Sequence, residues 1–360
     1  MIPVLIFFGI LTIICIIPAY NLLTARRLTP MTTKTKPFVS ILIPPRNEEQ
    51  NIKEFLPKVL NQTYQNYEVI VLNDHSEDNT LKELNKLKNS RLKIINGKPL
   101  PKDWTGKNWA CHQLSLEAKG GLYLFLDADV ELKPEALESA IALYQEERVS
   151  MLSCFPQQRM KSLGEWLIVP IIDLLSLTLL PLELIKHTKT KLISIAIGQF
   201  ILIDKKAYQN IGGHKSVKNK KTEDTGIARL MKQHGFKISV VRSIDLVKCR
   251  MYSDLWTSIQ GLSRSVYDGT NMKIPIYILG IIMYICIFIL PMFLIFTNLN
   301  FIIIFIPLYV TRISTAILAG QDLVKTSILF PIHLMIFPLI AINSIYISLT
   351  HQVVWKGRVI

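Results

Sequence analysis

Three long stretches without a charged residue constrain this chain more than any other feature. They cover residues 1–20, 274–311 and 326–355. A helix needs about 20 apolar residues to cross the hydrocarbon layer of a bilayer, so the second stretch could hold most of two helices. We therefore expect one N-terminal anchor and three C-terminal membrane helices. The C-terminal helices are expected at about 275–296, 299–320 and 327–349.

The first apolar stretch is interpreted as an uncleaved anchor and not as a signal peptide. No basic residue precedes it, and Arg26 and Arg27 follow it as a stop-transfer flank. An anchor and three later spans would put Lys356 and Arg358 outside the cell. The positive-inside rule argues against that placement, so one apolar segment could be re-entrant.

The net charge of +14 belongs mainly to the middle of the chain and to the flanks of the apolar stretches. Basic residues in those places follow the positive-inside rule and match an anionic lipid surface. We therefore expect a multi-pass protein of the cell membrane whose central domain is cytoplasmic, with no nucleic-acid partner. The five cysteines show no metal-ligand spacing and predict no disulfide framework.

The middle of the chain alternates between short apolar runs and helical patterns. Runs at 38–43, 67–72, 92–95 and 122–126 read as buried strands, with helical patterns between them. This alternation predicts an α/β fold with a mostly parallel sheet, flanked by N- and C-terminal transmembrane helices. Residues 149–155 and 193–204 are expected to add further strands.

Polar side chains follow the predicted strands at the points where they end. These are Arg46, Asn47, Glu48, Asp74, Asp127 and Asp129. Ligands bind at the carboxyl ends of strands in open α/β sheets, so we expect these side chains to share one edge. Asp127 and Asp129 point to the same side of an extended chain and suit a divalent cation that carries phosphate oxygens. A solvated Asp-x-Asp turn is the alternative.

Two further polar positions have alternative interpretations. Lys107 lacks the spacing of a phosphate loop, so it is either a point charge for a phosphate or a solvated lysine. Asp224 stands at the predicted start of a helix, where it either complements the helix dipole or acts in catalysis. Thr222 and Asn47 are expected to cap the helices that follow them.

The apolar segment 165–186 is interrupted by Pro170, Asp173 and Pro181. A spanning helix tolerates such residues poorly, so we expect an in-plane or re-entrant helix pair on the membrane surface. Buried core helices are the alternative. The sequence thus divides into an anchor (1–27), a linker (28–37), a cytoplasmic domain (38–260), a connector (261–273) and C-terminal transmembrane helices with a tail (274–360).

Five ordered motifs in this chain resemble those of family 2 glycosyltransferases. They lie at 39–48, 69–80, 127–129, 212–213 and 222–224. Segments 103–113, 249–252 and 354–358 are similar to the bacterial carotenoid-acid glucosyltransferase subgroup, with hopanoid-associated enzymes nearby. The resemblance implies an inverting transferase with a nucleotide-binding sheet, a UDP-sugar donor and Mg²⁺ or Mn²⁺.

The resemblance also implies a role for each matching residue. Pro44, Arg46, Glu48 and Asp74 would hold uracil and ribose, with Asp127 accepting from ribose. Asp129 would bind the metal and Asp224 would be the general base. The chain departs from the family at Pro45 and at Asn73-Asp74-His75. Gln260 and Arg264 match only part of a motif of membrane polymer synthases, which argues against a processive synthase.

The membrane segments favour a lipid as the acceptor. A carotenoid acid or another isoprenoid fits, and so do diacylglycerol and sphingoid lipids, with glucose as the favoured sugar. Polysaccharide synthesis and a non-catalytic scaffold that binds nucleotide sugars remain alternatives. A transporter is disfavoured because intramembrane charge is nearly absent, Arg312 excepted. The sequence predicts no oligomeric state.

Overall fold

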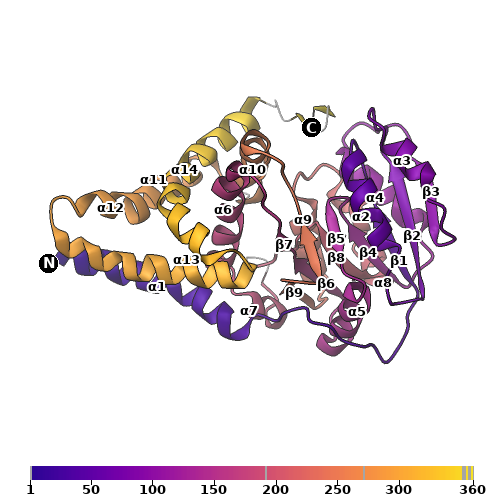
Figure 1. Cartoon of the computed structure of the whole chain (residues 1–360), viewed down its shortest axis with the longest axis horizontal. Helices are drawn as coiled ribbons and strands as arrows, with labels where there is room; N and C mark the ends of the chain where they lie inside the picture. Colours follow the sequence, from indigo (N-terminus) through magenta and orange to yellow (C-terminus); the bar gives the residue numbers. More distant parts are fainter. Residues whose placement is uncertain (1, 191–192, 271, 351–353, 356–357, 360) are drawn as a thin grey trace.

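A computed structural model describes residues 2–190, 193–270, 272–350, 354–355 and 358–359. An α/β domain and a group of long apolar helices lie next to each other along the longest axis of the molecule (Figure 1). The N-terminal end lies far from the α/β domain, at the distal end of the helical part. The first helix, α1, therefore runs from that end back to the domain.

The domain is built around a seven-stranded sheet with the order β3-β2-β1-β4-β8-β6-β9. The strands are β1 (Val39–Ile43), β2 (Tyr67–Asn73), β3 (Leu92–Asn96), β4 (Leu122–Leu126), β6 (Met151–Phe155), β8 (Phe200–Asp204) and β9 (Ile238–Arg242). Strand β8 is antiparallel to β4 and β6, and the other pairs are parallel. The predicted mostly parallel α/β sheet is confirmed.

Helices cover both faces of the sheet, which is why its strands are continuous apolar runs. One hydrophobic core lies between the sheet and α2, α3 and α5, and a second lies between the sheet and α4, α7, α8 and α9. The bounds are α2 (Glu49–Val59), α3 (Thr80–Lys86), α4 (Gly106–Glu117), α5 (Ala136–Glu147), α7 (Leu182–His187), α8 (Lys205–Asn210), the 3-10 turn η1 (Gly213–Val217) and α9 (Glu223–Gln233).

A small second sheet begins directly after Asp129. It has the order β5-β10-β7 and joins β5 (Val130–Leu132), β7 (Gln157–Gln158) and β10 (Val247–Cys249). Strand β10 pairs antiparallel with β5, so that Cys249 lies opposite Val130. This pairing brings the segment after β9 back to the carboxyl edge of the main sheet.

Two local predictions are wrong. The strand predicted at 193–204 forms only at Phe200–Asp204, because the backbone of Gly198 and Gln199 bonds instead with Asp224 and Asp127. Asn47 does not cap α2; it adopts a left-handed backbone with φ 51°, and its side-chain oxygen accepts from the backbone N–H of Glu77 at 2.8 Å.

Four helical segments of the described chain are long and apolar enough to cross a membrane, namely Ile2–Thr24, Ile274–Leu294, Leu299–Ala319 and Leu323–Thr350. They match the four segments expected from the sequence. The elements are α1 (Ile2–Thr24), α11 (Ile274–Tyr284), the π-helical turn η2 (Ile285–Ile289), α12 (Leu290–Leu294), the 3-10 turn η3 (Leu299–Ile304), α13 (Phe305–Ala319) and α14 (Leu323–Thr350).

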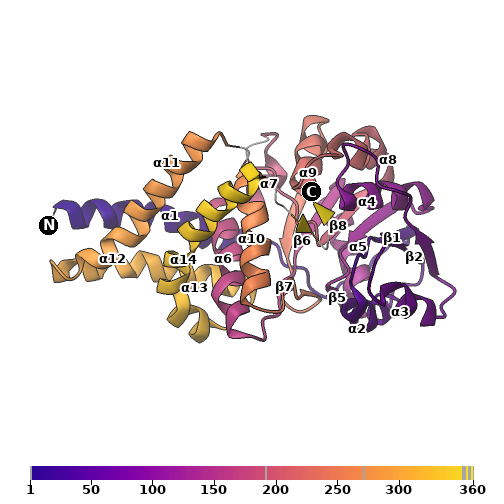
Figure 2. The same ribbon diagram turned by 90° about the horizontal axis from the view of Figure 1, so that it is seen from above.

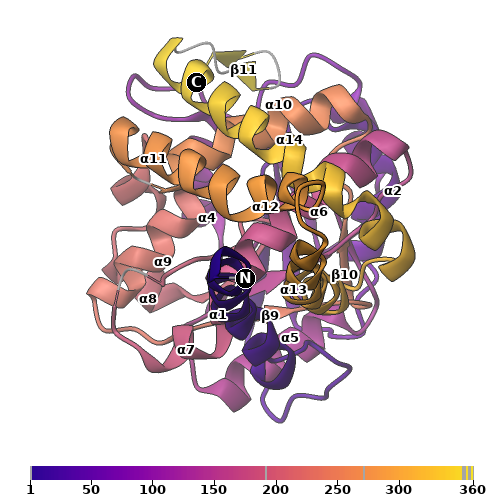
Figure 3. The same cartoon turned by 90° about the vertical axis from the view of Figure 1, so that its left-hand side faces the viewer.

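Helix α14 does not run alongside α1 and α13. Figure 3 looks along those two helices and shows α14 lengthwise across them. Helix α10 (Leu255–Thr270) lies between α14 and the domain (Figure 2). The outer face of α14 exposes apolar side chains along its whole length, including Val324, Ile332, Leu339 and Tyr346. Such a face suits contact with lipid.

The segment 165–186 forms a long helix, α6 (Leu163–Leu179), followed by the short α7. Helix α6 packs against α1, α10, α13 and α14, which favours the packed-helix alternative over exposure on a membrane surface. Its Asp173 is buried and accepts from Gln321 at 2.6 Å, and Gln321 in turn accepts from Arg312. The charges in this apolar region thus serve helix packing.

The short hairpin β11 (Val354–Trp355) and β12 (Arg358–Val359) follows α14. Lys356, which the topology argument uses, lies outside the described residues.

Candidate active site

The loops after β1 and β2 are joined at the carboxyl edge of the sheet. Arg46 is buried, and its guanidinium donates to the backbone oxygens of Asp74 at 2.8 Å and His75 at 2.5 Å. It also pairs with Glu77 at 2.9 Å. The planar fork of an arginine can hold several acceptors in this way. Arg46 therefore shapes the loop that carries Asp74.

The other side chains predicted to hold a nucleoside border the same loops. Asp74 is buried, its N–H donates to Pro45, and its carboxylate faces Gly97. Glu48 accepts from the amide of Asn51 at 2.7 Å, while its backbone N–H donates to Thr80. Pro44 lies directly after β1, before these loops.

Lys107 connects the fourth strand with helix α9. Its ammonium lies 2.9 Å from the carboxylate of Asp127 and 3.0 Å from that of Glu223. Burial disfavours the charged form of Lys107, but the two carboxylates outweigh burial and raise the pKa of the ammonium. The solvated-lysine alternative is therefore wrong. Lys107 stays charged and holds two acidic segments together.

Asp224 lies in the same cluster. One carboxylate oxygen accepts from the N–H of Gly198 at 2.9 Å, and the other accepts from the N–H of Thr225 at 2.6 Å. A Cβ at Gly198 would lie 3.2 Å from both Asp224 and Lys107, so a larger residue here would press on both side chains. Burial, and then the charge of Glu223, raise the pKa of Asp224 to about 7.

Asp129 lies between β4 and β5, and its side chain contacts Cys249 of β10. Burial raises the pKa of the Cys249 thiol, and the charge of Asp129 and its hydrogen bond with the thiol add to that effect. The charges of Asp127 and Glu48 also raise the pKa of the Cys249 thiol. Gln199 donates to Cys249 at 3.0 Å. Asp129 thus contacts a buried sulfur that the charges of Asp127 and Glu48 also influence.

A second buried thiol shows that the remaining acidic residues are close as well. Burial raises the pKa of Cys111, and the charges of Glu223, Asp127 and Asp74 raise it further while Lys107 opposes them. The charges of Asp74, Asp127 and Glu223 therefore all influence one buried thiol of α4. The helix position predicted for Thr222 is right, because it precedes α9, but its side chain makes no capping hydrogen bond.

The acidic residues fit a metal that arrives with its phosphates. Among the described residues, no three His, Cys, Asp or Glu side chains form a complete metal site. Mg²⁺ and similar hard cations typically take one or two protein carboxylates and complete their shell with phosphate oxygens and water. Asp129 and the partly exposed Asp127 supply such oxygens.

Sequence reasoning missed three residues of this site. Glu223 stood inside a motif but received no role, although it pairs with Lys107. Gly198 and Cys249 carried no signal of their own, because their importance depends on contacts with Asp224 and Asp129. The run 249–252, which marked the subgroup resemblance, was the one signal that pointed to Cys249.

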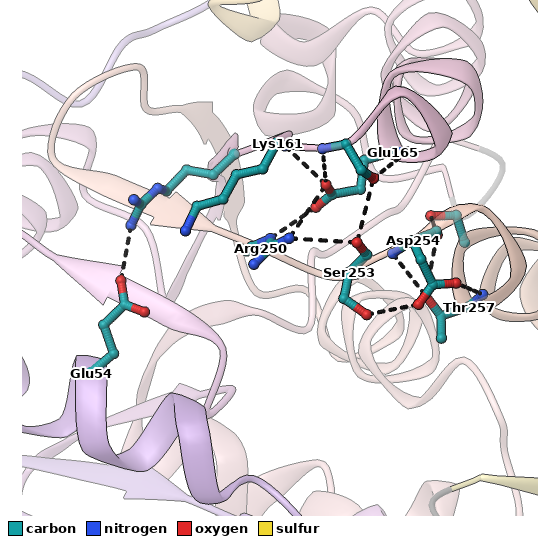
Figure 4. A network of polar contacts seen from close by, with 10 residues as sticks. Glu54, Lys161, Glu165, Arg250, Ser253, Asp254 and Thr257 are labelled. Atoms are coloured by element: carbon teal, nitrogen blue, oxygen red, sulfur yellow. Dashed lines mark hydrogen bonds and ion pairs between the residues drawn. The ribbon is translucent and has the colours of Figure 1, made fainter.

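Arg250 connects the site to the apolar helix α6. Its guanidinium donates to the buried carboxylate of Glu165 at 2.9 Å, at the start of α6 (Figure 4). Glu165 also accepts from the backbone of Lys161 and Ser162 and completes a capping box with Ser162. Arg250 directly follows Cys249, so its contact with Glu165 fixes the start of α6 relative to the acidic edge of the sheet.

We expect Arg250→Ala to destabilise the protein by about 3 kcal/mol, because Glu165 would stay buried without its cation. The apparent Tm of the purified full chain should fall by roughly 5 °C. Arg91→Ala is a matched control, since Arg91 bonds with Gln65 at the surface and should cost less than about 1 kcal/mol. Equal Tm values for the two variants would contradict a stabilising role for the Arg250–Glu165 pair.

Comparison with known proteins identifies the domain. Residues 40–212 match the sequence profile of glycosyl transferase family 2. This part of the chain is therefore similar to family 2 glycosyltransferases. It is 26% identical to 4,4'-diaponeurosporenoate glycosyltransferase of Staphylococcus haemolyticus, over 90% of this chain and 89% of that protein. The protein of the same name from Staphylococcus aureus strain N315 is 27% identical, over 71% of this chain and 68% of that protein.

A solved structure shares the fold of the family 2 chain. A mannosyltransferase from Pyrobaculum calidifontis, solved in complex with GDP-Man and Mn²⁺, superposes with a TM-score of 0.56 and 14% sequence identity. The match covers 95% of this chain and 100% of the mannosyltransferase. The mostly parallel α/β sheet therefore has the fold of this mannosyltransferase.

Proposed function

We propose that this protein is a membrane-bound inverting glycosyltransferase that moves glucose from a UDP-sugar to an isoprenoid lipid, with a carotenoid acid as the favoured acceptor. The observation that carries the proposal is the cluster of Asp127, Lys107, Glu223 and Asp224 beside a group of apolar helices. The names of the relatives support the carotenoid acid. The catalytic domain is assigned to the cytoplasmic side.

The donor would lie along the carboxyl edge of the sheet. Asp74, Glu48, Pro44 and Arg46 border the loops assigned to uracil and ribose, and Asp127 would accept from the ribose. Asp129 would hold Mg²⁺ or Mn²⁺, which supplies charge neutralisation for the departing diphosphate when bound. The mannosyltransferase of the same fold was solved with a nucleotide sugar and Mn²⁺, which supports this assignment.

Asp224 would be the general base of a single displacement. The acceptor oxygen bonds to the anomeric carbon as the bond from that carbon to the diphosphate breaks, and UDP leaves with the electron pair. The acceptor proton passes to Asp224. A carboxylic acid that is already ionised has little proton to give up, so this base role applies to a hydroxyl acceptor or to the protonated form of an acid.

The test uses membranes that contain the full chain, a radiolabelled UDP-sugar and extracted lipids. We expect label to enter the organic phase only when Mg²⁺ or Mn²⁺ is present. Label in diacylglycerol or sphingoid lipids, or in a water-soluble polymer, would contradict the isoprenoid acceptor. Binding of UDP without hydrolysis or transfer would contradict an enzyme and indicate a scaffold.

We expect the rate of transfer to fall as the pH drops below about 7. The pKa of Asp224 is raised to about 7, and only the ionised form can accept a proton. Each pH unit below the pKa should therefore cost about tenfold in rate. The measurement is the initial rate under saturating donor between about pH 5.5 and 8.5. A rate that does not change over that range would contradict the role of Asp224 as base.

A further inference from the structure

A cavity of about 290 Å³ lies among the apolar helices and has no part in the donor site. Helices α1, α6, α11, α13 and α14 and the turn η2 contribute its walls, together with the end of α10. Apolar side chains dominate these walls. Aromatic rings supply much of the surface, namely those of Tyr277, Tyr284, Phe288, Phe330 and Phe337.

Two residues that line this cavity carry buried hydroxyl groups without a partner. Thr178 and Tyr277 both line it, both are more than nine-tenths buried, and neither hydroxyl has a hydrogen-bond partner among the described residues. Thr178 belongs to the last turn of α6 and Tyr277 to the first turn of α11. A buried hydroxyl group without a hydrogen-bond partner costs free energy. A ligand with a polar group near Thr178 and Tyr277 would supply that partner.

The cavity also comes close to the start of α9, the helix that carries Asp224. Thr270, the last residue of α10, lines the cavity. A Cβ on Gly269 would lie 3.9 Å from the methyl group of Thr222, and the ammonium of Lys221 lies 3.0 Å from the carboxylate of Asp268. Thr222 and Lys221 directly precede the first turn of α9. The end of α10 thus contacts both the cavity and the approach to the base.

We propose that this cavity binds the chain of an isoprenoid polyene, with the polar end of the molecule directed past Thr270 toward Asp224. The proposal rests on the proposed function, since it assigns the acceptor of the same reaction. The aromatic walls favour a flat conjugated chain over a flexible acyl chain, because aromatic rings stack on flat surfaces. Thr178 and Tyr277 would bond with the acceptor near its polar end.

Gly280 allows a direct test. It lines the cavity, and a Cβ there would meet no atom within 4 Å, so Gly280→Phe can fill the space without strain. Gly9→Phe is the matched control, because Gly9 is also helical with no atom near its Cβ but does not line the cavity. The probe is a 30-carbon apocarotenoic acid, added to the full chain in detergent and compared with palmitic acid.

We expect Gly280→Phe to weaken binding of the apocarotenoic acid by about tenfold or more, since the ring displaces several buried carbon groups of the chain. Gly9→Phe should bind it like the unchanged protein. Metal-dependent hydrolysis of the UDP-sugar should be equal in all three proteins. Unchanged polyene binding by Gly280→Phe, or tighter binding of palmitic acid by the unchanged protein, would overturn the proposal.

The same measurements separate this proposal from the proposed function. If the unchanged protein neither hydrolyses nor transfers any UDP-sugar, the proposed function fails, while polyene binding and its loss in Gly280→Phe still test the cavity. If transfer to lipid is normal in both the unchanged protein and Gly280→Phe, the enzyme stands and the cavity assignment is overturned.

Discussion

Asp224→Asn is expected to slow sugar transfer by about 10²–10⁴-fold, which is the usual contribution of a general base. Asparagine has nearly the same shape and keeps an oxygen that can accept from Gly198 or Thr225. It cannot accept a proton at neutral pH. The rate is measured as label transferred to the lipid phase, and donor affinity is measured by titration with UDP.

Donor affinity should change little in Asp224→Asn, because the nucleoside loops lie on the strands β1 and β2 and not on α9. Asp245→Asn is the control, since Asp245 is a surface carboxylate that pairs with Arg27 at 2.7 Å. A near-normal rate in Asp224→Asn would refute the base assignment. A loss of UDP binding in that variant would show that Asp224 supports the donor instead.

Asp129→Asn should weaken metal-dependent binding of the UDP-sugar by about 100-fold. Loss of a residue that only supports a metal ligand already lowers metal affinity by about 10–100-fold. The amide removes a negative charge that a hard divalent cation prefers. The measurement is the affinity for UDP at increasing Mn²⁺ concentrations. Without divalent metal, the variant and the unchanged protein should bind UDP equally weakly.

The interpretation of Asp129→Asn depends on an intact fold, because Asp129 contacts the buried Cys249. The apparent Tm of the variant should therefore be compared with that of Asp245→Asn. If the two match and the Mn²⁺ dependence of UDP binding is unchanged, Asp129 does not hold the metal. Asp127 would then be the next carboxylate to test, together with its partner Lys107.

Much of the fold could be predicted because its signals are local. Short apolar runs that end in polar residues predicted the strands, since a strand buried on both faces leaves no room for polar side chains. The four apolar segments were predictable because the thickness of a bilayer sets the length of a helix. The direction of α14 was not predictable, since packing against α10 and α6 sets it.

The interpretation of Lys107 shows where local reasoning fails. In the sequence, Lys107 stands between polar residues and resembles a solvated lysine. In the structure, Asp127 and Glu223 approach it from segments far away in the chain. The roles proposed for Asp74, Asp127, Asp129 and Asp224 remain predictions that the experiments above test.

The sequence by itself determined the parallel α/β sheet, the acidic residues at its edge and the apolar helices at both ends. These follow from burial and periodicity, which act over a few residues at a time. Only the tertiary structure decided that Lys107 joins Asp127 to Glu223, that Gly198 bonds with Asp224, and that the end of α10 lies near both a cavity and Thr222. Those features depend on contacts between distant segments, which no local pattern specifies.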